Sequence, residues 1–140
     1  MQSTIGKRYH WEMSHRLPLL EGKCKNIHGH SYHLWIEVAG ETNASGMVMD
    51  YYLLDSLVLP LIEQFDHAFM CNKDDNLMVD FLKENDFKYF IIPEFSTAEN
   101  IAEYILRELI KVFKAYRNVT ELTIRVHETE HSYAEAKSRI

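Results

Sequence analysis

The chain has 140 residues, which predicts one domain spanning 1–140 with a substantial apolar core. Its formal net charge of −6 argues against general nucleic-acid binding, which needs a basic face. The N-terminal residues contain no apolar run of signal-peptide length, and no window approaches the ~18 apolar residues that cross a membrane. Cys24 and Cys71 alone cannot form a disulfide framework. We therefore expect free thiols, a cytoplasmic location, and neither a nucleic-acid nor a membrane partner.

Two β-rich segments occupy the first third of the chain. Strand-forming aromatic residues predict a strand over 5–13, and a second strand is expected over 30–41. Between them, 17–26 indicates a loop around Pro18 and Gly22.

The middle of the chain favours helices. Asp50 can cap a helix that runs to about residue 65, since apolar residues recur there at helical spacing. Pro60 interrupts this pattern and predicts a kink or an early break. A short helix over 75–86 and a short strand over 87–92 are expected to follow.

The last third predicts a helix and two strands. Ser96 and Glu99 have the spacing of a capping box, which predicts that a helix begins there and continues to about residue 116. Apolar and polar residues alternate over 119–128, as in a half-buried strand, and 132–140 is expected to form the last strand. This order of elements predicts an α+β domain with an antiparallel sheet.

The stretch "CKNIHGHSYHL" is the strongest chemical feature. His28 and His30 lie two positions apart, so in a strand their imidazoles point to the same face, whereas His33 points to the other. A catalytic zinc ion needs a third nitrogen ligand, and His15 at the end of the first strand is the best candidate.

The same residues also allow simpler interpretations. Histidines separated by one residue occur on many surfaces without a metal. Cys24 could be a fourth ligand of a closed structural zinc site, a nearby acid or base, or a small loop residue.

Two further segments carry side chains that could act in proton transfer or ligand binding. Asp66 precedes His67, an arrangement typical of an oriented general base, although such a dipeptide also occurs in ordinary helix-end loops. Glu128 ends the alternating strand, where a carboxylate could accept two N–H donors from a flat ring or could simply be exposed.

Taken in order along the chain, these residues resemble one known family. The motifs that carry the resemblance run from the first strand to the last and are His15 in "HRL", Cys24 and "HGH", "GMV" with Asp50, Asp66-His67, "STAEN" from Ser96, and Glu128-Thr129. This order is similar to that of the 6-pyruvoyltetrahydropterin and 6-carboxytetrahydropterin synthases.

The resemblance implies a fold and an assembly. The fold would be the tunnelling fold, a four-stranded antiparallel sheet with two main helices on one face. Subunits would close into an oligomeric barrel, a homo-oligomer such as a trimer or a dimer of trimers, with active sites at the interfaces.

The resemblance also implies roles for individual residues. Zinc would be held by His15, His28 and His30. Cys24 would be the general acid or base near the metal. Asp66 and His67 would form a proton relay, and Glu128 would anchor the pterin ring, with Thr97 helping to hold the edge of the ring.

The spacing after Cys24 indicates a branch of the family. Three residues separate Cys24 from His28, as is usual in the carboxy branch that serves 7-deazaguanine (queuosine-type) synthesis, whereas the pyruvoyl branch usually has five. The implied substrate is 7,8-dihydroneopterin triphosphate, converted with loss of acetaldehyde and triphosphate. The alternatives are the pyruvoyl reaction, which eliminates triphosphate only, and a non-catalytic zinc-stabilised binding protein. The connection 73–95 is longer than is common in the family.

Overall fold

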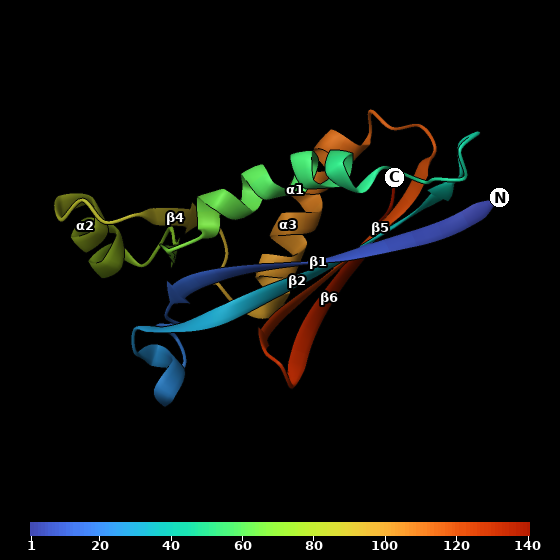
Figure 1. Ribbon diagram of the computed structural model, residues 1–140. Helices are drawn as coiled ribbons and strands as arrows, with labels where there is room; N and C mark the ends of the chain where they lie inside the picture. The colour runs from blue at the N-terminus through green and yellow to red at the C-terminus, as the bar shows by residue number, and fades with distance from the viewer.

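Six strands form one mixed sheet, in the order β4-β3-β1-β2-β5-β6, in the computed structural model, which describes residues 1–140 (Figure 1). The elements in chain order are β1 (Gln2–His15), the 3-10 turn η1 (Lys23–Lys25), β2 (His28–Glu41), α1 (Tyr51–Phe65), β3 (Ala68–Asn72), α2 (Asn76–Glu84), β4 (Tyr89–Ile92), α3 (Ala98–Phe113), β5 (Val119–Thr129) and β6 (Ser132–Arg139). The long strands β1, β2, β5 and β6 pair antiparallel. The short strand β3 pairs parallel with both β1 and β4.

The expected α+β class is confirmed, but the sheet is larger than the four antiparallel strands expected. Strands β3 and β4 extend it on the far side of β1. The sequence did not predict β3 because all five of its side chains are buried. A strand buried on both faces shows no alternation of apolar and polar residues.

The core lies between one face of the sheet and the helices α1 and α3, which cover the same face (Figure 1). Strand β1 sends Tyr9, Trp11 and Met13 into this core, and the Trp11 ring stacks on Tyr32 of β2 at 5.2 Å between centroids. The alternation continues to the strand ends. His15 of β1 and His30 of β2 therefore point toward the helices.

Helix α1 begins as expected but does not break at Pro60. The Asp50 carboxylate accepts hydrogen bonds from the amides of Tyr52 and Leu53, at 2.7 and 3.3 Å, and so caps the helix. Of the expected kink or early break at Pro60, the early break is wrong, since the helix continues to Phe65, where it was expected to end. Burial of four apolar side chains along α1 offsets the ~3 kcal/mol that an interior proline costs.

Helix α3 begins one residue later than the predicted capping box implies. Its N-cap is Thr97, whose hydroxyl accepts from the Asn100 amide at 3.2 Å. Ser96 is buried and bonds to His15 instead, so the predicted role of Ser96 as the cap is wrong. None of the helices has both the length and the apolar character needed to span a bilayer.

Candidate metal centre

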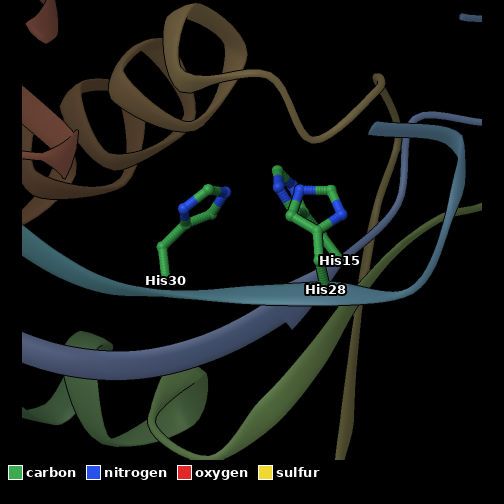
Figure 2. A group of neighbouring side chains, drawn as sticks. All are labelled: His15, His28 and His30. Atoms are coloured by element: carbon green, nitrogen blue, oxygen red, sulfur yellow. The ribbon is translucent and has the colours of Figure 1, made fainter. Parts of the chain in front are cut away.

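Three histidines converge where β1 ends and β2 begins. Their ligand nitrogens all lie within 4.8 Å of one another. His15 is the register partner of His28 across the antiparallel pair, and His30 follows two residues along β2. Figure 2 shows the three rings rising from the strands toward the loop that precedes α3. The structure thus brings together His15, His28 and His30, the residues that strand parity and the resemblance indicated.

Backbone carbonyls orient two of these rings. Nδ1 of His15 lies 2.8 Å from the Ser96 carbonyl oxygen, and Nδ1 of His28 lies 2.8 Å from the Asn26 carbonyl oxygen. A carbonyl only accepts, so in both rings Nδ1 donates and Nε2 keeps its lone pair. Histidines that bind metals are commonly oriented in this way.

The third histidine leaves a buried nitrogen without a partner. Nε2 of His30 is buried and makes no hydrogen bond, and its nearest charged group is the Glu128 carboxylate at 3.7 Å. A buried polar atom without a partner costs free energy, so its presence indicates a ligand that the site is built to hold.

The protonation states also fit a metal ion. Burial lowers the pKa of His15 to about 4, and burial followed by repulsion from His28 lowers the pKa of His30. Both rings are therefore neutral at pH 7, as metal ligands must be. The ligand nitrogens, all within 4.8 Å of one another, are close enough together to hold one metal ion. Three neutral nitrogens with an open fourth position are the donor set of a catalytic zinc site.

Glu128 borders this centre from β5. It has the same parity as Val126, which is buried in the core, so its carboxylate faces the helix side of the sheet. Burial and the neighbouring Glu99 raise the pKa of Glu128, while His28 acts in the opposite direction. A half-buried carboxylate beside the metal centre is well suited to bind a flat ring that offers two N–H groups.

Cys24 lies outside the group of histidines. It sits in the exposed turn η1, and its carbonyl accepts from the Leu17 amide at 2.8 Å. The turn thus places the thiol on the loop that leads into His28. The cluster of potential ligands contains three histidines and no thiol.

Asp66 and His67 lie on the other side of the β1 strand end. The Asp66 carboxylate accepts from the Glu12 amide at 3.0 Å and contacts Nδ1 of His67 at 3.0 Å. The Glu12 amide, followed by His67, lowers the pKa of Asp66. His67 lines an open hollow of about 370 Å³ together with Glu12, Ser31 and His30, although it is not among the three histidines whose ligand nitrogens converge. One chain therefore forms the Asp66–His67 pair but does not bring it into the histidine cluster.

Thr97 lies at the N-terminus of α3, directly after the residue that holds His15. Besides capping the helix, it lines an apolar hollow of about 210 Å³ with Leu17, Leu19 and Phe95. The sequence did not identify Ser96 and Asn26 as residues that orient the ligands. They act through backbone carbonyls, which have no signature in the sequence.

A sheet covered by two helices, with a three-histidine centre at the ends of neighbouring strands, defines an α+β protein with a candidate metal site. The family model of 6-pyruvoyl tetrahydropterin synthase matches residues 4–139, so the chain belongs to this family, as the resemblance indicated.

Relatives of known name share most of their length with the chain. It is 34% identical to the 6-carboxy-5,6,7,8-tetrahydropterin synthase of Haemophilus influenzae, over 94% of this chain and 96% of that protein. It is 30% identical to the protein of the same name from Rickettsia conorii, over 92% and 96%. The crystal structure of the 6-pyruvoyl tetrahydropterin synthase from Plasmodium vivax has the same fold. Its TM-score is 0.80 at 20% identity, and the match covers 100% of this chain and 99% of that chain.

Proposed function

We propose that the chain is a zinc-dependent 6-carboxy-5,6,7,8-tetrahydropterin synthase, a lyase. It would convert 7,8-dihydroneopterin triphosphate to 6-carboxytetrahydropterin, releasing acetaldehyde and triphosphate, in 7-deazaguanine (queuosine) synthesis. The observation that carries this proposal is the group of three histidines whose ligand nitrogens lie within 4.8 Å of one another, bordered by Glu128. The carboxy branch is favoured by the names of the relatives and by the three residues between Cys24 and His28.

The metal would be held by Nε2 of the three histidines. Zinc bound there would supply Lewis acidity to the side-chain oxygens of the substrate. The surrounding chain would keep His15 and His30 neutral through burial and would hold two of the rings through the carbonyls of Ser96 and Asn26.

Glu128 would fix the pterin ring so that the side chain of the substrate lies over the histidines. A carboxylate can accept two parallel N–H bonds from a guanidine-like ring edge, and such positioning lowers the barrier by holding reacting groups in place. Thr97, next to the residue that holds His15, would contact the same edge of the pterin.

Proton transfer would fall to Cys24 and to the Asp66–His67 pair. A thiolate near the metal can take a proton from carbon or oxygen at neutral pH. His67, held by Asp66 at 3.0 Å, can carry a proton on the opposite side of the substrate. Since His67 lies on the other side of β1 from the metal group, the relay would come from a neighbouring copy, with the active site at the subunit interface.

Product analysis tests this proposal. The purified zinc protein is incubated with dihydroneopterin triphosphate, and the pterin and any acetaldehyde are identified. 6-Carboxytetrahydropterin with acetaldehyde is the expected result. Triphosphate release without acetaldehyde would assign the pyruvoyl reaction instead, and unchanged substrate would assign a non-catalytic binding protein. In the Cys24→Ala variant we expect turnover to be lost and zinc to be retained.

A further inference from the structure

The side chain of Lys88 bonds to the end of helix α1. Its Nζ donates to the carbonyl oxygens of Glu63 and Asp66, at 2.7 and 2.6 Å. Helix α1 has no basic residue in its own last turn, so Lys88 supplies from outside the cation that suits a helix C-terminus.

The backbone of Lys88 is anchored on the opposite side of the same turn. Its carbonyl accepts from the Phe69 amide at 3.0 Å, where β3 begins. The side chain bonds to Asp66 and the main chain bonds to Phe69, so Lys88 is fixed both before and after His67.

His67 needs such support because its backbone has φ = +59°, a conformation unfavourable for residues with a β-carbon. Its amide donates to the Glu12 carbonyl, 2.6 Å away, and the Asp66 carboxylate accepts from the Glu12 amide at 3.0 Å. These two bonds set the direction of the imidazole only while the chain remains in this turn.

We propose that Lys88 is a positioning residue that holds the turn at Asp66 and His67 and thereby orients the imidazole for proton transfer. This inference rests on the proposed function for its catalytic consequence, although its structural part does not. It also gives a role to the long connection 73–95, which supplies Lys88 at the start of β4. None of the three histidines lies near Lys88 in the sequence. Its side chain contacts neither these histidines nor Glu128, so it acts only through the turn.

The test compares three variants. Lys88→Met keeps the length of the side chain but removes its charge and donors. Lys88→Arg keeps both the charge and the donors. Lys83→Met is the matched control, because Lys83 lies on the same connection, is exposed and makes no hydrogen bond or ion pair.

Amide hydrogen exchange gives a readout that does not depend on the reaction. In Lys88→Met we expect exchange at the amides of His67 and Glu12 to be about tenfold faster or more, with the buried amide of Ile36 unchanged. Lys88→Arg should restore most of the protection, and Lys83→Met should have no effect. Unchanged exchange at His67 would overturn the proposal. Faster exchange throughout the sheet would also overturn it, because it would show that Lys88 only stabilises the fold.

Kinetics then test the consequence for catalysis. In Lys88→Met we expect kcat to fall about tenfold while KM and zinc content stay near those of the wild type, since displacing a catalytic group impairs the chemical step. If the wild type turns over and Lys88→Met matches it despite a loosened turn, the positioning role is wrong. If the wild type does not turn over the substrate, the proposed function fails, and the exchange result still decides whether Lys88 holds the turn.

Discussion

Ser96 holds the ring of His15 through two atoms. Nδ1 of His15 lies 2.8 Å from the Ser96 carbonyl oxygen and 3.1 Å from its hydroxyl oxygen. The loop before α3 therefore fixes the direction of a ligand on β1, although the two residues are far apart in the sequence. Packing of α3 on the sheet is thus part of what makes the candidate metal centre.

Removing the Ser96 hydroxyl should weaken metal binding without abolishing it. In Ser96→Ala the carbonyl still accepts from His15. We therefore expect zinc affinity to fall about tenfold, the smaller of the losses that follow when a residue orienting a metal ligand is replaced. Competition with a chromogenic chelator measures this affinity. Ser3→Ala, an exposed serine on the same strand as His15, is the control and should bind zinc like the wild type.

The two faces of β2 should differ completely in metal binding. Replacing His15, His28 or His30 by alanine should each remove stoichiometric zinc, since two nitrogens do not hold the ion in an open site. His33→Ala changes the same strand on the opposite face and should keep zinc. Metal analysis after dialysis checks this, and zinc retained by His28→Ala would contradict the assignment.

Acid should destabilise the metal-free protein through His15. The pKa of this residue is lowered to about 4 in the folded state, against an ordinary value near 6.5, so the unfolded chain binds the extra proton first. The free energy of unfolding therefore falls as the pH drops from about 6.5 to 4, by about 3 kcal/mol for this group. Urea denaturation across this range measures it. His15→Gln removes the titrating group. The free energy of unfolding of this variant should therefore fall less between these two pH values than that of the wild type, by the same amount.

Glu128→Gln should impair substrate binding and spare the metal. The amide keeps one acceptor but loses the charge and the second acceptor. We therefore expect KM to rise roughly 10- to 100-fold, which corresponds to the free energy of one charge-assisted hydrogen bond. Steady-state kinetics and zinc analysis give the two readouts. The control is Glu130→Gln, because Glu130 lies in the exposed turn after β5. Loss of zinc from Glu128→Gln would show a role at the metal instead.

Mixed oligomers should reveal whether two copies share one site. His67→Ala and His30→Ala are each expected to be inactive, because one lacks the relay and the other the metal. If the relay of one copy serves the metal centre of the next, reassembling the two variants together should restore part of the activity. Activity that stays at zero on mixing would place both halves of the site in a single chain.

Strand parity, a local rule, was sufficient to predict that His28 and His30 share a face, whereas His15 was a candidate from the neighbouring strand that the family resemblance supported. His28 and His30 fall on one face of β2 and His33 on the other, as a period of two requires. The partners of His15 and His28 could not be predicted in this way, because backbone carbonyls carry no residue-specific signal.

The position of Asp66 and His67 relative to the sheet also could not be predicted from the sequence. It depends on β3, which pairs parallel with β1 and sets the turn from α1 beside Glu12. The five buried residues of β3 show no alternation, so neither the strand nor the side of the sheet to which the turn belongs could be inferred.

Two long strands of the sheet, β1 and β6, have backbone groups without a ladder partner. Strand β3 pairs with β1 only at Met13 and Ser14, so the stretch 2–11 of β1 has no ladder partner on that side, and β6 has none beyond β5. Such edges favour uncontrolled aggregation unless they are covered. Since the two edges are different strands, joining β6 of one copy to β1 of the next would be a head-to-tail contact, which gives a ring where the rotation between copies closes and a filament where it does not. Such a contact would pair the long edges of β1 and β6 and would leave only the short strand β4 at the end of the sheet unpaired, so the backbone groups that favour aggregation of a lone chain would become an interface between copies.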